Sequence, residues 1–229
     1  MTDFHSDRRQ LLQIGGAAVA SLALPALGQS YPAKPIKLIC PWPAGGSSDM
    51  VMRALAESAS KFIGGQVIIE NKAGASGMLG PNELVKATPD GYTLSQVTIG
   101  VARLPHMQKM QFDPLKDFTY IVCLTGYTFG IVAVPDAPFT TIKDMVAYAK
   151  ANPGSVEYGS TGTGTTPHLA MEEFSHKVGI VLNHIPYKGA AQVVTDVMGG
   201  QLDSSFATLG SVLPQVQAGK LTALAVASP

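Results

Sequence analysis

The stretch that decides the fold is IKLICPWPAGGSSDMVMRALAESASKFIG, residues 36–64. It begins with an apolar run, Ile36–Cys40, which is typical of a buried strand. A loop of proline, tryptophan, alanine and glycine follows, and a helical pattern begins after Ser47, Ser48 and Asp49. A strand, a glycine-rich loop and a helix in this order often hold an anion, because the N–H groups at a helix N-terminus point at the ligand.

Short apolar runs continue to alternate with helical patterns along the chain, which predicts βαβ units and an α/β fold with mainly parallel sheets. Besides Ile36–Cys40, the predicted strands are Gln66–Glu70, Tyr92–Val97, Tyr120–Leu124, Phe129–Val134, Val156–Gly159, Leu182–Ile185, Gln201–Ala207 and Thr222–Ala227. The first helix is expected to bury Val51, Leu55, Ser58 and Phe62, and two later helices are predicted at Thr141–Ala151 and Ala190–Met198.

The alternation of apolar runs with helical patterns stops at residues 121–138, IVCLTGYTFGIVAVPDAP. Two strand patterns follow each other there with no helical pattern between them. We interpret this break as a crossing from a first α/β lobe, residues 31–124, to a second lobe, residues 125–229. The chain closes on an apolar strand pattern, LTALAVASP, with no covering helix after it. We therefore expect the sequence to stop before the fold does.

Composition excludes several classes of partner. The chain has 229 residues, with 16 Lys and Arg against 16 Asp and Glu, and no basic run. This neutral balance argues against nucleic acid or anionic membrane as the partner, since both require clustered cations. Cys40 and Cys123 both lie in strand patterns and are expected to be buried free thiols. No Cys/His spacing fits a metal site, and no cofactor is expected.

The N-terminal residues 1–28 are typical of an export signal. Arg8 and Arg9 precede a weakly apolar stretch that closes on the small-x-small pattern Ala26-Leu27-Gly28. The paired arginines resemble the twin-arginine type, although Asp7 replaces the usual Ser or Thr. The alternative, a membrane anchor, is disfavoured because the apolar run is short and interrupted by glycine and proline. We predict export to the periplasm, by the twin-arginine or the general secretory route.

Candidate site residues follow the strands, because ligands of open α/β sheets lie beyond the carboxyl ends of the strands. The loops there are rich in Gly, Ser, Thr and Ala, which is the composition of backbone N–H cradles supported by hydroxyl groups. The predicted ligand-binding residues are Trp42, Ala44, Gly45, Gly46, Ser47, Ser48, Asp49, Thr98, Ser160, Thr161, Gly162, Thr163, His168, Tyr187, Gly189, Ala190, Ala191, Ala207 and Thr208.

Nucleotide and hydrolase motifs are absent from these loops. AGGSSD has no lysine before its serine, and GTGTTP has Pro167 where the dinucleotide fingerprint requires glycine. YGSTG around Ser160 is not the G-x-S-x-G elbow. His168 and His184 are therefore expected to cap or pack rather than to catalyse.

A carboxylate is the anion that suits such loops, because a few N–H groups hold it without a cationic side chain. We expect the glycines at 45 and 46 to allow its close approach, either through space or through the φ angle. Two roles remain open for Asp49, which either favours the helix dipole or accepts a hydrogen bond from a ligand amine or hydroxyl. Trp42 forms an apolar wall over the ligand or covers the core.

Several long segments together resemble the Bug solute receptors, the TctC-like binding proteins of tripartite tricarboxylate transporters. They are residues 31–94, YGSTGTGTTPHLAMEEF, HIPYKGAAQVVTDVMGGQLD and AGKLTALAVAS. The resemblance implies a two-lobed, type II periplasmic-binding-protein fold that closes about a hinge on a small carboxylate. It also implies delivery to membrane permease subunits.

By the resemblance, the ligand loops correspond to Trp42–Asp49, Ser160–His168 and the turn at Tyr187, Lys188 and Gly189. Trp42 stands where the family more often has Phe. The family's chains also continue beyond residue 229 and return to complete the first lobe. The resemblance therefore implies that the first lobe is incomplete and that residue 229 lies at the start of the return crossing. We expect a monomeric binding protein and not an enzyme; the alternatives are an exported hydrolase that uses Ser160 or Ser48, and a ligand-sensing partner of a membrane kinase.

Overall fold

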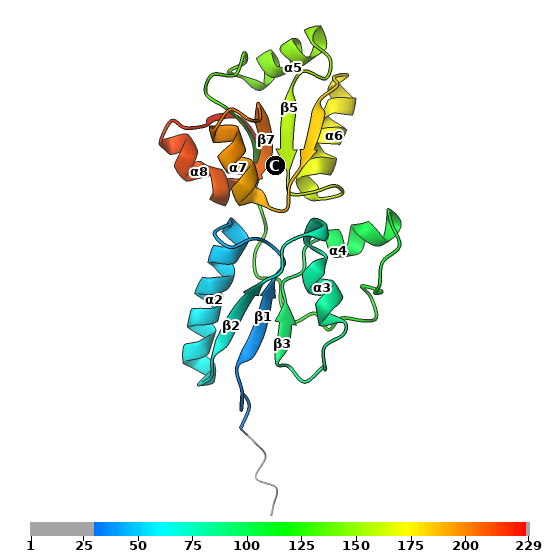
Figure 1. The fold of residues 1–229 in the computed structure, drawn as a ribbon, viewed down its shortest axis with the longest axis vertical. Helices are drawn as coiled ribbons and strands as arrows, with labels where there is room; N and C mark the ends of the chain where they lie inside the picture. The colour runs from blue at the N-terminus through cyan, green and yellow to red at the C-terminus, as the bar shows by residue number, and fades with distance from the viewer. Residues whose placement is uncertain (1–29, 228–229) are drawn as a thin grey trace, which may run out of the picture. The chain divides into compact units, whose positions relative to one another are not determined.

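Three strands early in the chain form a parallel sheet in the order β2-β1-β3 (Figure 1). The computed structural model describes residues 30–227, so the predicted signal segment lies outside the described residues. β1 (Ile36–Cys40) lies in the centre, between β2 (Val67–Asn71) and β3 (Thr93–Ser95). Because the strands are parallel, their carboxyl ends meet at one edge of the sheet.

The long helix α2 (Ser47–Ile63) packs on one face of this sheet. Its Met52 contacts Leu38 and Cys40 of β1 in one hydrophobic cluster. Of the side chains predicted to be buried, Leu55 packs against this cluster. Val51 is 46% exposed, Phe62 is 89% exposed and Ser58 is exposed, contrary to prediction. Alanine and serine populate both faces of α2, so the few large side chains did not mark the face that packs. The side chains that α2 does bury are those of Ser48, Asp49, Met52 and Ala56.

Short helices cover the opposite face of the first sheet. Gly80 in α3 lies so close to the sheet that a Cβ atom there would be 3.1 Å from Cγ2 of Ile39. A second cluster, formed by Met78, Val101, Leu104 and Phe112, extends this layer. The short elements are η1 (Ala75–Gly77), α3 (Leu79–Leu84), α4 (Gly100–Arg103) and η2 (Leu104–His106).

Five strands form a second sheet in the order β6-β5-β7-β4-β8. β5, β6 and β7 run parallel to one another, whereas β4 is antiparallel to both of its neighbours. The strands are β4 (Phe129–Ala133), β5 (Glu157–Ser160), β6 (Asn183–Pro186), β7 (Ser204–Thr208) and β8 (Thr222–Ala227).

Helices cover both faces of the second sheet. The side chains of β4 point alternately to the two faces, and both sets are apolar. Ile131 and Ala133 belong to the cluster that contains α5 (Ile142–Ala151) and α6 (Thr166–Val178). Val132 points the other way, into the cluster that contains α7 (Ala190–Met198) and α8 (Leu209–Gln217). The period of two places successive side chains on opposite faces, so a strand buried on both sides is apolar throughout.

The mainly parallel α/β architecture is confirmed, and β1, α7 and β8 have the predicted bounds. Other predicted strands are shifted or shortened by a few residues; β7, for example, begins at Ser204 because Gln201–Asp203 form a turn after α7. One predicted strand, Tyr120–Leu124, is absent. Its backbone pairs with no strand among the described residues, and Ile121 is 74% exposed. Cys40 is buried as predicted, but Cys123 is exposed, contrary to prediction.

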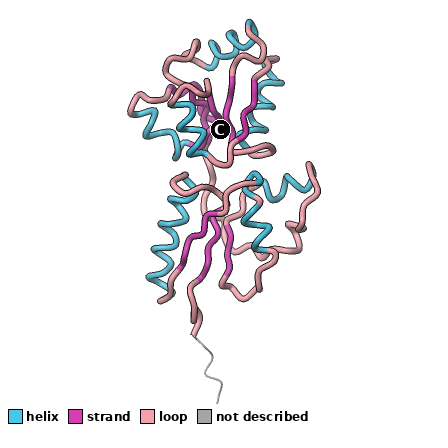
Figure 2. The backbone as a smooth tube through the Cα atoms, in the orientation of Figure 1, coloured by secondary structure: helices cyan, strands magenta, loops and turns pink. Residues whose placement is uncertain are grey.

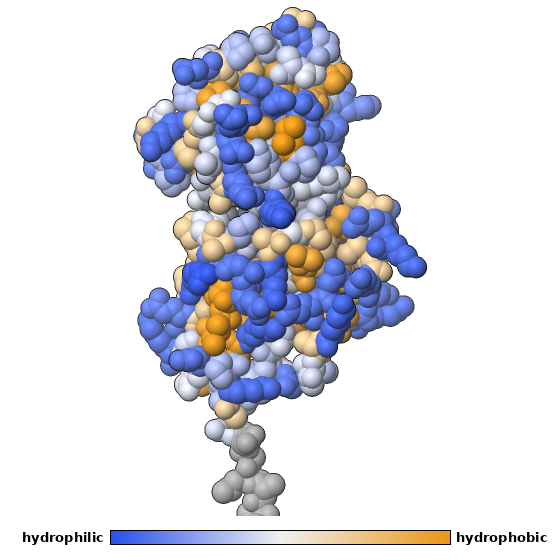
Figure 3. All heavy atoms as spheres, viewed as in Figure 1, coloured by the Kyte–Doolittle hydropathy of each residue, from blue (hydrophilic) through white to orange (hydrophobic). Residues whose placement is uncertain are grey.

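Residues 107–128 connect the two sheets and contain no helix or strand (Figure 2). By their contacts the described residues from Lys34 onward form one unit. We propose that the two sheets are the cores of the lobes expected at 31–124 and 125–229. No helix within the described residues has the length and apolarity that a membrane crossing requires. Hydrophilic side chains interrupt the hydrophobic ones over the face drawn in Figure 3.

Candidate functional site

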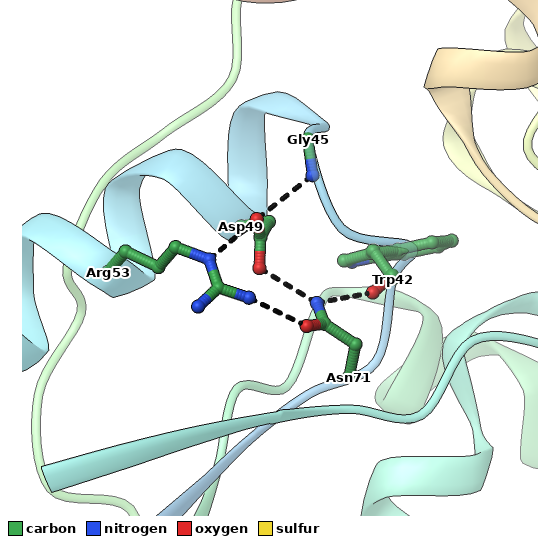
Figure 4. A network of polar contacts seen from close by, with 5 residues as sticks. All are labelled: Trp42, Gly45, Asp49, Arg53 and Asn71. Atoms are coloured by element: carbon green, nitrogen blue, oxygen red, sulfur yellow. Dashed lines mark hydrogen bonds and ion pairs between the residues drawn. The ribbon is translucent and has the colours of Figure 1, made fainter.

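Asp49 organises the loop that follows β1 (Figure 4). Its Oδ2 accepts hydrogen bonds from the Gly45 backbone N–H at 2.9 Å and from Arg53 Nε at 2.9 Å, and its Oδ1 accepts one from Asn71 Nδ2 at 2.8 Å. Asn71 also donates to the Trp42 carbonyl oxygen at 3.0 Å. The carboxylate therefore ties the start of α2, the preceding loop and the end of β2 together.

The electrostatics of Asp49 fit a structural role. Burial of the carboxyl raises its pKa, but the hydrogen bonds from Arg53, Gly45 and Asn71 and the charge of Arg53 outweigh burial, so the pKa is lowered. The side chain is only 4% exposed. Both carboxylate oxygens already accept protein donors. This supports the structural alternative for Asp49 rather than contact with a ligand amine.

The two glycines of this loop differ in their backbone conformation. Gly45 has a φ of +82°, which only glycine adopts without strain. Gly46 has a φ of −76° and a ψ of 165°, and a Cβ there would lie 3.6 Å from the Pro43 carbonyl oxygen, an ordinary contact. The φ angle therefore requires glycine at Gly45 but not at Gly46, where the other alternative, space for the close approach of a ligand, stays a prediction.

Trp42 packs on two sides. Its ring contacts the cluster of Leu38, Cys40 and Met52. The ring also lies over Gly77, where a Cβ would be only 2.9 Å from Cζ2 of Trp42. Trp42 therefore covers the core, and the glycine-rich turn at 74–77 lies against it.

The turn beside Trp42 is strained. Ala75 and Ser76 have φ angles of +47° and +54°, in the left-handed region that residues with a Cβ rarely adopt. Ser76 donates a hydrogen bond from Oγ to the Thr163 carbonyl oxygen at 2.7 Å. Thr163 belongs to the loop after β5, so this strained turn contacts the second sheet's ligand loop. Strain of this kind concentrates at functional sites.

The loop after β5 is held by side chains from the second sheet. Ser160 Oγ lies 2.6 Å from His184 Nε2 and accepts the Gly162 backbone N–H at 3.1 Å. Gly162 has a φ of +125°, and a Cβ there would lie 2.8 Å from Ser76 Oγ. His168 Nδ1 accepts the Gly164 backbone N–H at 3.2 Å. Both histidines therefore pack and position the loop, as predicted.

The Ser160–His184 pair has the spacing of a nucleophile and its base, but not the accessibility. Ser160 is 1% exposed, so a substrate does not reach its Oγ atom. Burial lowers the pKa of His184, and the neighbouring His168 lowers it further. The rings of the two histidines are 4.1 Å apart. No acidic side chain is hydrogen-bonded to His184 among the described residues, so the arrangement lacks the third member of a triad.

The turn after β6 contacts the first sheet's loop. Gly189 precedes α7 and lies directly against the Pro43 ring, with no room for a Cβ. The Tyr187 hydroxyl donates to Asp196 Oδ2 at 2.6 Å, along α7. Burial and this bond raise the pKa of Tyr187 to about 12. Tyr187, Ala191, Gln192, Thr195 and Asp196 line an open hollow of about 340 Å³ on this helix.

Hydrogen bonds between side chains join the loops of the two sheets. Ser47 Oγ lies 3.1 Å from Thr208 Oγ1. Arg103 Nη2 donates to Thr166 Oγ1 at 2.6 Å. Ser48 Oγ lies 2.7 Å from the hydroxyl of Tyr127, in the connecting segment, and Gln96 Nε2 donates to the same hydroxyl at 2.8 Å. The loops after β1, β5, β6 and β7 thus converge.

Four helices that begin at these loops lack a side-chain cap. No side chain accepts a hydrogen bond from the first turn of α2, α6, α7 or α8. By contrast α5, which begins away from these loops, has a complete capping box formed by Thr141 and Asp144. The N-terminus of an uncapped helix keeps free N–H donors and a partial positive charge. Four such ends meeting in one region favour an anion.

Several predicted residues contribute only their backbone, and some important ones were not predicted. Ala44, Ala190, Ala191 and Ala207 have no polar side chain, and no side-chain hydrogen bond involves Thr98 or Thr161 in the described part of the chain. Sequence reasoning missed Asn71, Ser76, Arg103 and Tyr127. Asn71 ends β2 and satisfies the same strand-end rule, so that signal was available. Arg103 follows Thr98 by five residues.

Comparison with known proteins identifies the family of the chain. Residues 51–229 match the family model described as the tripartite tricarboxylate transporter family receptor. The chain belongs to this family. Within the described residues no group of His, Cys, Asp and Glu is arranged to hold a metal ion.

Individual relatives agree with this assignment. The chain is 45% identical over 224 residues to a UPF0065 protein of Cupriavidus necator, covering 95% of this chain and 68% of the relative. The periplasmic binding protein BugD superposes with a TM-score of 0.80 and 33% identity, covering 86% of this chain and 67% of BugD. Rpa4515 of R. palustris, solved with adipate, gives a TM-score of 0.83 and 29% identity, covering 86% and 67%. The chain thus spans about two thirds of these relatives, and its fold is that of solute-binding receptors.

Proposed function

We propose that this receptor captures a small carboxylate between its two lobes and delivers it to membrane permease subunits. The observation that carries the proposal is the convergence of four uncapped helix N-termini, those of α2, α6, α7 and α8. Each end offers N–H donors and a partial positive charge of about half an elementary charge. A carboxylate there needs no cofactor, and the charge of the solute is compensated by backbone dipoles.

The hydrogen bonds between loops support closure as the mechanism. Ser47 with Thr208, and Ser76 with Thr163, link the sheets in the same region as the uncapped helices. A receptor of this type exchanges between open and closed arrangements, and the solute shifts the population to the closed one. In the closed arrangement Ser47 and Ser48 donate hydrogen bonds to the carboxylate, either in place of their bonds to Thr208 and Tyr127 or in addition to them.

Membership of the family supports the periplasm as the place of capture and a permease as the recipient. The relative Rpa4515, solved with adipate, makes carboxylic acids the solutes to test first. We further propose that the receptor acts as a monomer, which size-exclusion chromatography tests. A sensing role would use the same closure, and pull-down from membranes distinguishes a permease partner from a kinase.

Calorimetric titration with a panel of mono- and dicarboxylates tests the proposal. We expect at least one acid to bind and to raise the midpoint of thermal unfolding, since ligand at about a hundred times its Kd adds about 2.7 kcal/mol of stability. Ser48→Ala should weaken binding about tenfold, the value of one hydrogen bond to a charged group. Lys188→Ala should have a small effect, because this lysine is exposed. Failure of every carboxylate to bind would reject the proposal.

The hydrolase alternative is tested in the same preparation. The buried position of Ser160 argues against it, and Ser48 Oγ is bonded to a tyrosine hydroxyl and not to a base. Generic esters should therefore be stable in the presence of the protein. Turnover that disappears in Ser160→Ala would support catalysis instead.

A further inference from the structure

Two histidine rings support the loop that follows β5, residues 160–165. The rings of His168, in α6, and His184, in β6, have centroids 4.1 Å apart. Nδ1 of His168 accepts the Gly164 backbone N–H at 3.2 Å, near the end of the loop. Nε2 of His184 lies 2.6 Å from Oγ of Ser160, at its start. The loop is therefore held at both ends by side chains that can take up a proton.

The contact of His168 exists in only one protonation state. Because Gly164 donates its N–H, Nδ1 of His168 is the nitrogen without a hydrogen. A protonated imidazole carries hydrogens on both nitrogens and accepts no hydrogen bond. Gly164 is buried, so its N–H would lose its partner, and a buried donor without a partner is unfavourable. A proton on His168 therefore opposes this conformation of the loop.

The contact of His184 extends into the loop through Ser160. Oγ of Ser160 accepts the Gly162 backbone N–H at 3.1 Å and lies 3.3 Å from the Gly162 carbonyl oxygen. A neutral His184 accepts the Ser160 hydroxyl or donates to it, whereas a protonated His184 only donates. The hydroxyl then depends on the longer bond to the Gly162 carbonyl oxygen. A proton on His184 therefore also changes how the loop is held.

The side chains packed against the rings favour the neutral pair. Tyr158 of β5 stacks on His184 with centroids 4.9 Å apart and donates its hydroxyl to Glu172 of α6 at 2.7 Å. Burial and this bond raise the pKa of Tyr158, which stays a neutral donor. Burial and the neighbouring His168 lower the pKa of His184, and they outweigh the charge of Glu172, which raises it. Two positive rings this close would also repel each other.

The start of α6 adds to this preference. His168 is the third residue of α6, a helix with no side-chain cap and no acidic residue in its first turn. A positive charge there is unfavourable because the N-terminus of a helix carries a partial positive charge. Arg103 brings a second positive charge to the same turn, since its Nη2 donates to Thr166 Oγ1 at 2.6 Å.

We propose that the pair of His168 and His184 makes solute capture sensitive to pH: the neutral pair holds the loop in its binding conformation, and a proton on the pair releases the loop and lowers the affinity. This inference rests on the proposed function, in which the N-terminus of α6 is one of the helix ends that hold the carboxylate. Histidine is suited to the task because its charge changes between about pH 5 and 8.

A simpler role for the two rings is packing alone. Rings that only pack stay neutral over this range of pH. The affinity for a carboxylic acid would then follow only the titration of the acid itself. That titration is the same for every variant of the protein, so it cancels when variants are compared with the same acid.

Calorimetric titration with acetate, succinate and adipate at about pH 7.5 and about pH 5.5, within the range over which histidine changes charge, separates these roles. In His168→Asn the Oδ1 atom replaces Nδ1 as the acceptor for Gly164 and takes up no proton. For each acid that binds, the unmodified protein should lose at least about threefold more affinity on acidification than this variant, because one linked proton changes an affinity by up to about tenfold per pH unit.

Two further variants complete the comparison. His184→Gln places an amide near the position of Nε2 and should also reduce the loss of affinity on acidification, which keeps the test decisive if His168→Asn does not fold. His176→Gln removes an exposed histidine farther along the same helix and should keep the whole dependence.

Hydrogen exchange read by mass spectrometry tests the loop without any solute. After correction for the chemical exchange rate, the protection of residues 160–168 should fall at the lower pH in the unmodified protein and fall less in His168→Asn. The segment 142–151 of α5, whose capping box contains no histidine, is the internal reference and should keep its protection.

An equal loss of affinity on acidification in the unmodified protein, His168→Asn and His184→Gln would overturn the inference and leave the proposed function intact. Protection of residues 160–168 that is independent of pH would overturn it as well. Absence of binding by all three acids at the higher pH would count against the proposed function itself, and against this inference with it.

Discussion

The backbone N–H of Gly45 donates a 2.9 Å hydrogen bond to Oδ2 of Asp49, four residues later. The bond closes the loop between β1 and α2 over a carboxylate that is almost completely buried. It leaves the N-terminus of α2 without a side-chain cap, because Asp49 lies inside the helix and bonds backward to the loop. The loop is therefore built before any solute arrives.

Asp49→Asn should destabilise the protein. The amide keeps the size of the carboxyl group but has only one acceptor atom, so one of the donors from Gly45, Arg53 and Asn71 loses its partner. Loss of one hydrogen bond to a buried charged group costs about 1.5–3 kcal/mol. Urea unfolding of the variant and the unmodified protein measures this difference.

Glu57→Gln is the matched control on the same helix. Glu57 pairs with Lys61 at 2.8 Å, but their side chains are 73% and 71% exposed. Exposed pairs contribute little, so the free energy of unfolding should change by less than about 0.5 kcal/mol. A similar loss in both variants would show that the buried network around Asp49 has no special weight.

Substitution of the two loop glycines by alanine should separate their roles. Gly45→Ala forces a side chain into a φ of +82° and should cost about 1–2 kcal/mol, with loss of carboxylate binding as the loop shifts. Gly46→Ala meets no steric barrier and should cost less, about 0.5–1 kcal/mol, because glycine is preferred to alanine at a helix N-cap. Unfolding and titration of both variants provide the comparison. The reverse order of effects would contradict this account of the loop.

Tyr127→Phe should weaken the attachment of the connecting segment to the first sheet. The variant removes the hydroxyl that contacts Ser48 and Gln96, whose Oε1 atom already has no partner. Polar groups left buried without partners cost about 1–3 kcal/mol, measurable by thermal unfolding. Tyr120→Phe is the control, because the Tyr120 hydroxyl makes one exposed bond to the Pro114 carbonyl oxygen. Comparable losses at both sites would refute the prediction.

Stability should fall as the pH drops below about 6.5, because burial lowers the pKa of His184 in the folded state. The unfolded chain takes up this proton first, so the contribution is complete above the unfolded pKa and is lost as the pH falls through the folded one. His184→Gln should flatten the dependence between pH 7 and 5, measured by urea unfolding. His176→Gln, at an exposed position, should keep it; an unchanged slope in His184→Gln would exclude this histidine as its source.

Export by the twin-arginine route is tested at the paired arginines of the N-terminal segment. Changing Arg8 and Arg9 together to lysine should leave precursor in the cytoplasm, detected by cell fractionation and blotting. Normal export of the double variant would exclude this route and favour the general secretory one, without affecting the prediction of a signal segment.

Local sequence signals were enough to predict the α/β architecture and to select most of the candidate loops. Apolar periodicity predicted α7 and β8 with their observed bounds, because a buried face repeats at the period of its own element. The strand-end rule selected the loops at 42–49 and 160–168, because parallel strands bring their carboxyl ends to one edge. Periodicity failed for Tyr120–Leu124, since an apolar run becomes a strand only where another strand pairs with it.

Only the tertiary structure decided which side chains meet. Ser47 and Thr208 are 161 residues apart in the sequence and 3.1 Å apart in space. Arg103 and Thr166 are likewise joined only because packing places Arg103 against the start of α6. The sequence by itself determined a family, an α/β fold and a set of polar loops. Asn71 meets Asp49, His184 meets Ser160 and Thr166 meets Arg103 only in the folded chain, because hydrogen bonding between distant segments leaves no local pattern.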